Sequence, residues 1–122
     1  MNRTIFFKYI FLLLLGCCAC YPVKTKKPSL LLPMDSVAVL VADSYFLEGE
    51  IYVKQREYDI KDYTIAKYDS FFFAHNITKD IYAENVKYYL TTDKFAEKMM
   101  NKIDTLVDQR VAALRDSLNV KQ

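Results

Sequence analysis

Few side chains in this 122-residue protein are suited to acid–base chemistry. His75 is the only histidine, and Asp43 and Glu48 are carboxylates that interrupt an apolar stretch. Five residues apart on one helix, the two carboxylates diverge by about 140° and cannot form a close acid pair by themselves. No nucleophile accompanies His75 in the sequence, so we interpret it as complementing a helix dipole. The sequence predicts no enzymatic activity, cofactor or metal site; catalysis would require all three residues to meet in one cleft.

The N-terminal residues carry the features of an export signal. Arg3 and Lys8 are positively charged, and residues 9–16 form an uninterrupted apolar run. A positive region followed by a short apolar region is typical of a secretory signal peptide. The run is shorter than the stretch of about 20 apolar residues that spans a bilayer. We therefore interpret residues 1–16 as a signal peptide that is removed during export.

The cysteines that follow the apolar run point to lipid modification. All three lie between positions 17 and 20, so no disulfide can staple the rest of the chain. The segment Leu14-Leu15-Gly16-Cys17 resembles the bacterial lipobox, in which the cysteine is acylated and becomes the mature N-terminus. Cys17 is the expected lipidation site, and Cys20, preceded by Ala19, is the alternative. The expected lipid makes the membrane one partner of the protein.

The charge balance changes when the signal is removed. The 17 basic and 15 acidic residues become 15 of each once Arg3 and Lys8 are lost. A neutral chain without a clustered basic face predicts no nucleic-acid partner. Lys24, Lys26 and Lys27 lie close after the lipidation site, where they either contact anionic lipid headgroups or merely keep a tether soluble.

The prolines divide the mature chain into a linker and a domain. Pro22, Pro28 and Pro33 all precede Met34, and only Gly49 among later residues is a glycine. Residues 17–32 therefore carry the lipidated cysteine and a flexible, extended linker, and residues 33–122 form one domain. Because hairpins need turn residues that this domain lacks, we predict an all-α fold, a small bundle of about four helices.

Helix signals divide the domain into four segments. The first helix is expected at about 34–55, and the second begins after Asp62 and ends near Asn76. Thr78 is a suitable N-cap for the third. The fourth, at about 93–119, would be roughly 40 Å long, longer than the others can cover. Its C-terminal part packs on the first helix, protrudes, or meets a partner.

Aromatic residues are abundant in the domain, and they support two interpretations. One is an aromatic core whose hydroxyl groups reach the surface. The other is a partner or ligand surface, because tyrosine is enriched at interfaces. The candidates for such a surface are Tyr45, Phe73, Tyr88 and Tyr89.

Several segments of the mature chain resemble a family of small Bacteroidetes lipoproteins, the domain of unknown function numbered 4296. The resemblance implies a helical envelope lipoprotein and no known activity. The most specific segment is the turn His75-Asn76-Ile77-Thr78. The other matching residues are Leu32-Pro33, the stretch 40–48, Tyr68, Phe72, Tyr82 and Tyr88-Tyr89.

These observations predict a non-enzymatic, lipid-anchored helical module of the cell envelope. It would bind another envelope protein through an aromatic patch or the end of the last helix. No acidic residue lies between Cys17 and Lys24, whereas surface-exported lipoproteins of Bacteroidetes tend to carry them there. We therefore expect the outer membrane and its periplasmic face. The alternative function is a carrier or sensor that holds a small apolar or aromatic ligand between helices.

Overall fold

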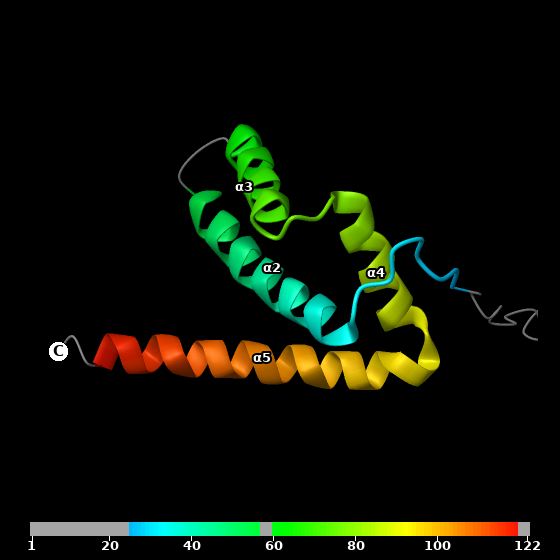
Figure 1. Cartoon of the computed structure of the whole chain (residues 1–122). Helices are drawn as coiled ribbons and strands as arrows, with labels where there is room; N and C mark the ends of the chain where they lie inside the picture. Colours follow the sequence, from blue (N-terminus) through cyan, green and yellow to red (C-terminus); the bar gives the residue numbers. More distant parts are fainter. Residues whose placement is uncertain (1–24, 57–59, 120–122) are drawn as a thin grey trace, which may run out of the picture.

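The computed structural model describes residues 25–56 and 60–119, and the described part of the chain is helical without strands (Figure 1). The helices are α2 (Met34–Lys54), α3 (Lys61–Ala74), α4 (Lys79–Thr91) and α5 (Asp93–Asn119). In Figure 1, α5 lies along one side while α2 rises away from it, with α3 next to α2. The predicted all-α bundle with a long C-terminal helix is confirmed.

The core lies where α2, α4 and α5 meet. Val37 and Val41 of α2 pack with Tyr89 of α4 and with Met99 and Ile103 of α5. Met99 and Ile103 are completely buried, and burial of each side chain contributes about 1.5–3 kcal/mol to folding. Among the helix pairs, α2 and α5 make the most extensive contact. The other two helices, α3 and α4, are positioned relative to this pair.

Local signals account for the helix ends. Asn76 has a φ of 51°, the left-handed conformation expected at a helix stop. The Thr78 hydroxyl oxygen accepts a hydrogen bond from the Ile81 N–H at 3.2 Å, as an N-cap does. The start of α3 differs from the expectation. This helix begins at Lys61, with Ile60 as a cap that makes no side-chain hydrogen bond, so Asp62 lies inside the first turn.

Helix α3 is the peripheral element of the bundle, since none of its residues is buried. Its first half is attached to α2 by polar groups: Glu50 accepts a hydrogen bond from the Tyr63 hydroxyl at 2.7 Å and pairs with Lys67 at 2.6 Å. The Lys67 ammonium and the Tyr63 hydroxyl lower the pKa of Glu50. At the other end, the rings of Phe71 and Phe72 contact the Tyr82 ring.

The segment before α2 is attached to α4 by a buried amide. Asn85 is completely buried, and its Oδ1 accepts a hydrogen bond from the Leu32 N–H at 2.8 Å. Its Nδ2 donates to the carbonyls of Leu30 and Ile81 at 2.9 and 2.8 Å. The Tyr89 hydroxyl donates to the Leu32 carbonyl at 2.6 Å. These last residues of the expected linker are non-helical but held in place, so the folded unit begins before Pro33.

The C-terminal part of α5 protrudes from the bundle. Every side chain from Ala112 to Asn119 is exposed. Leu114 and Leu118 are 54% and 65% exposed, although they continue the apolar stripe of the helix. The sequence left open whether this end packs on the first helix, protrudes or meets a partner; in the structure it protrudes (Figure 1).

Asn85→Ala tests the attachment of the N-terminal segment. The substitution removes three hydrogen bonds and leaves the Leu32 N–H without its side-chain partner. We expect the free energy of unfolding to fall by about 2–3 kcal/mol, measured by urea unfolding followed by circular dichroism. Asn101→Ala on the exposed face of α5 is the matched control, expected within about 0.5 kcal/mol of the parent. Equal effects of the two substitutions would contradict this role of Asn85.

Candidate functional site

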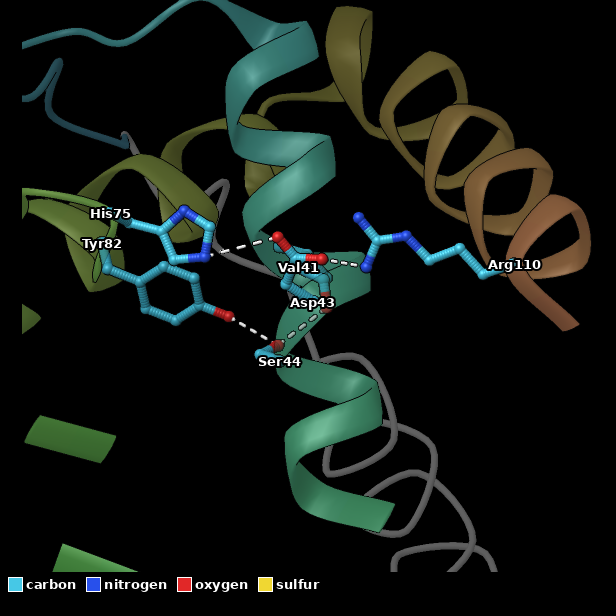
Figure 2. Close-up of polar contacts among 6 residues, drawn as sticks. All are labelled: Val41, Asp43, Ser44, His75, Tyr82 and Arg110. Atoms are coloured by element: carbon cyan, nitrogen blue, oxygen red, sulfur yellow. Dashed lines mark hydrogen bonds and ion pairs between the residues drawn. The ribbon is translucent and has the colours of Figure 1, made fainter. Parts of the chain in front are cut away.

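A polar cluster centred on Asp43 joins three helices (Figure 2). The Asp43 Oδ2 lies 3.3 Å from Nε2 of His75, the C-cap residue of α3. The Asp43 Oδ1 accepts a hydrogen bond from the Arg110 guanidinium of α5. The Asp43 side chain is 22% exposed, so both pairs are partly shielded from water. One carboxylate therefore links α2 to α3 and to α5.

Neighbouring rings hold the two partners of Asp43 in place. The His75 ring packs against Phe71, with 4.7 Å between the ring centroids. Arg110 lies over the Phe46 ring of α2, 5.7 Å from its centroid, a cation–π geometry. The left-handed turn at Asn76 ends α3 directly after His75. The cluster is therefore built partly from stacking and partly from charge.

A second polar link lies beside the first on α2. The Tyr82 hydroxyl of α4 donates to the Ser44 Oγ at 3.0 Å, and Ser44 donates to the Val41 carbonyl at 2.8 Å. Burial raises the pKa of Tyr82, while the hydrogen bond to Ser44 acts in the opposite direction. With its pKa above the usual value of about 10, Tyr82 stays a neutral donor at physiological pH. Figure 2 shows both links on adjacent residues of α2.

The geometry of this polar cluster is that of a cross-brace between helices. A catalytic use of His75 would need a nucleophile within hydrogen-bond reach. The Ser44 hydroxyl is instead engaged with Tyr82 and with the Val41 carbonyl. Glu48 is exposed, and its side chain makes no ion pair or hydrogen bond within residues 25–56 and 60–119. Of the three residues whose convergence catalysis would require, Asp43 and His75 meet and Glu48 stays apart.

Three members of this cluster, Arg110, Ser44 and Tyr82, were not among the candidate site residues, although Ser44 and Tyr82 lie in segments that carry the family resemblance. Arg110 had a detectable signal, because it follows Met99, Ile103 and Leu106 at helical spacing and places a charge in the apolar stripe of α5. For Ser44 and Tyr82, nothing in the sequence indicates that they bond to each other. Their pairing depends on how α4 crosses α2.

The predicted aromatic surface is wrong in part. Tyr45 and Phe73 are 51% and 88% exposed, but they lie on different helices. Tyr89 is 6% exposed and belongs to the core. It is buried because its ring packs against its neighbours while its hydroxyl finds the Leu32 carbonyl. Tyr88 is half-buried, with its ring beside those of Tyr89 and Phe95. The four residues therefore do not form one patch.

Two expectations remain: that the chain has no metal site, and that a cysteine near the N-terminus is lipidated. In the part of the chain that the structure describes, no three His, Cys, Asp or Glu side chains gather closely enough to hold a metal ion. Over the same residues, no helix combines the length and apolar character needed to cross a bilayer. Cys17 and Cys20 lie outside the described residues, so lipidation stays a prediction.

A double-mutant cycle on Asp43 and Arg110 measures the cross-brace. Asp43→Asn keeps the side-chain volume but removes the charge that both partners face. We expect it to lower the free energy of unfolding by about 1 kcal/mol, with a coupling to Arg110→Met of about 0.5–1 kcal/mol, since the pair is only partly exposed. Asp108→Asn on α5 is the exposed control and should show no coupling. A cycle in which Asp43 behaves like Asp108 would contradict the brace.

Comparison with known proteins gives no indication of the function, so the function must be inferred from the residues of this chain. No family model, no curated protein and no solved structure matches this sequence or fold. The residues that carry a functional argument are therefore the N-terminal cysteine motif, the Asp43 cluster and the exposed end of α5.

Proposed function

We propose that this protein is a lipid-anchored component of the bacterial cell envelope whose helical domain binds another envelope protein and catalyses no reaction. The observation that carries the binding role is the protruding end of α5, with Leu114 and Leu118 exposed. Exposing an apolar stripe to water is unfavourable, and a partner that covers the free helix end gains free energy by burying it.

The anchor rests on the N-terminal sequence. Cleavage before Cys17 and acylation of its thiol would attach the domain to the membrane, with Cys20 as the fallback. A diacyl or triacyl group provides stable attachment, whereas a single chain gives marginal binding. The acid-free stretch after Cys17 favours the outer membrane with the domain on its periplasmic side. Membership in the Bacteroidetes lipoprotein family of domain 4296 is part of this proposal.

The partner that fits the end of α5 is an amphipathic helix. Val107, Val111, Leu114 and Leu118 are spaced by four, three and four residues, the pattern of a helix–helix seam. Beside this seam, Phe46 of α2 and residues of α5 line an open pocket of about 460 Å³. An apolar side chain from a docked helix can enter such a pocket, which is the usual mode of helix-in-groove recognition.

The carrier or sensor function has less support. A larger groove of about 820 Å³ runs between α2 and α5. It is open, and its lining includes Asp35, Lys98 and Lys102. Lys102 pairs with Asp35 there and lowers the pKa of that carboxyl. Charged, open walls suit a small apolar ligand poorly because such a ligand would keep much of its surface in water.

Cys17→Ser tests the anchor. We expect the parent protein, purified from membranes, to have the mass of a chain that begins at residue 17 and carries acyl groups. In Cys17→Ser the thiol that accepts the lipid is absent, so intact-mass measurement should find the uncleaved, unacylated precursor. Cys20→Ser should leave cleavage and acylation unchanged. Normal acylation of Cys17→Ser would move the site to Cys20, and an unacylated parent would contradict the anchor altogether.

Photo-crosslinking in cells tests the binding surface. A photoreactive residue at position 118 should give an adduct with one other envelope protein, mapped by mass spectrometry to a helix of that protein. The same residue at Gln109, which is exposed earlier on α5, should not. Leu114→Glu should weaken the adduct because it places a charge in the seam, whereas Ala112→Glu on the opposite face is the matched control. Adducts with the lipoprotein alone, or none, would contradict a protein partner.

A further inference from the structure

A basic pocket lies where the N-terminal segment passes over α4. Thr25, Lys26, Lys27, Pro28 and Ser29 line one side, and Glu84 and Lys87 of α4 line the other. The pocket has a volume of about 350 Å³, enough for a small polar group. We refer to it as the lysine pocket.

The lysine pocket carries uncompensated positive charge. Three lysines, Lys26, Lys27 and Lys87, line the pocket together with a single carboxylate residue, Glu84. Within residues 25–56 and 60–119, none of the three lysines forms an ion pair or hydrogen bond through its ammonium group. All three side chains are exposed. Lysines that line one pocket and outnumber its carboxylates favour the binding of a phosphate or carboxylate there.

The walls of the lysine pocket are held in place before any ligand arrives. Pro28 is buried. The Thr25 and Thr91 hydroxyl groups lie 2.7 Å apart, and Asn85 bonds to the backbone of Leu30 and Leu32 just beyond the pocket. Lys87, sixty residues along the chain from Lys27, is thereby kept beside it. Such preorganisation reduces the entropic cost of binding an anion.

The length of the chain limits how far the expected anchor can be from this pocket. Cys17 precedes Thr25 by eight residues, which span at most about 29 Å when fully extended. A lipidated Cys17 would therefore keep the lysine pocket within that distance of the headgroups. In Figure 1 the N-terminal segment leaves the fold on the α4 side, while α5 ends on the opposite side.

We propose that the lysine pocket binds the phosphate group of an anionic lipid headgroup in the membrane that holds the anchor. The inference rests on the proposed lipid anchor and adds an orientation to it. With the pocket against the headgroups, α4 lies next to the membrane and the exposed end of α5 points away from it. The domain then presents its binding end to the periplasm.

Lysine labelling of the mature, lipidated protein in vesicles tests this proposal. The protein is reconstituted into vesicles of phosphatidylcholine alone or with one third phosphatidylglycerol, then labelled with an amine-reactive reagent and analysed by mass spectrometry. Lys87 is the decisive residue because it belongs to α4 and does not follow the anchor in sequence. The anionic vesicles should reduce its labelling about five-fold, the ratio that corresponds to about 1 kcal/mol for a lysine at an anionic surface.

The controls separate the lysine pocket from general attraction. Lys61, at the start of α3, should label equally in both vesicles, and high salt should remove the protection of Lys87. Lys27→Glu should reduce the protection of Lys87, whereas Lys79→Glu, at the other end of α4, should not. These substitutions are at exposed positions, so the fold is expected to be retained, which circular dichroism checks.

Each outcome decides a different question. Equal labelling of Lys87 in the two vesicles, with the protein bound to both, would overturn the headgroup site and leave the anchor intact. Failure of the protein to float with either vesicle would contradict the anchor instead. Equal protection by inorganic phosphate added to phosphatidylcholine vesicles would assign the pocket to a soluble phosphate and overturn the lipid assignment.

Discussion

Val37 and Val41 on α2 pack against Met99 and Ile103 on α5, and no disulfide reinforces them because all three cysteines precede the described helices. The free energy of folding therefore depends on a small apolar junction. Each of these buried side chains contributes about 1.5–3 kcal/mol, a large part of the 5–15 kcal/mol by which a small domain is stable. The direction of α2 relative to α5 follows from this junction. The places where polar side chains can meet follow from that direction.

The peripheral elements are attached to the junction mainly by polar side chains. Asn85 holds the segment before α2, and Asp43 connects α2 to α3 and α5. A buried amide with all its bonds satisfied gives a unique arrangement rather than much net stability, because its bonds replace bonds to water. The Asp43 cluster likewise fixes how helices are arranged, but its side chains are more exposed than that of Asn85. Its residues are of types that can do acid–base chemistry, and in the structure their side chains contact one another across the helices.

The two ends of the molecule differ in a way that suits a tethered binding module. Lysine side chains lie beside the N-terminal segment, and apolar side chains lie on the free end of α5. A charged end is favoured near anionic headgroups, whereas a protruding apolar stripe is favoured in contact with a protein. The length of α5, about 40 Å, separates these two surfaces. The proposed anchor and the proposed partner therefore do not compete for the same part of the domain.

The helices and their ends were predictable from residue types because the forces involved are local. Asn76 adopts the left-handed turn, Thr78 caps α4, and α5 runs from Asp93 to Asn119 as its apolar spacing indicates. The start of α3 was misplaced because Ile60, which has no capping side chain, precedes it.

Contacts between helices were decided by tertiary structure. Sequence patterns identified Asp43 and His75 as unusual residues, yet their pairing, and the share of Arg110 in it, depend on the crossing of three helices. Tyr89 is a second example, because the sequence was compatible with either a surface or a core position for its ring. The hydrogen bond from its hydroxyl to the Leu32 carbonyl makes the core position favourable. Spacing along a helix specifies which side chains share a face. Only the packing of one helix on another determines what that face meets.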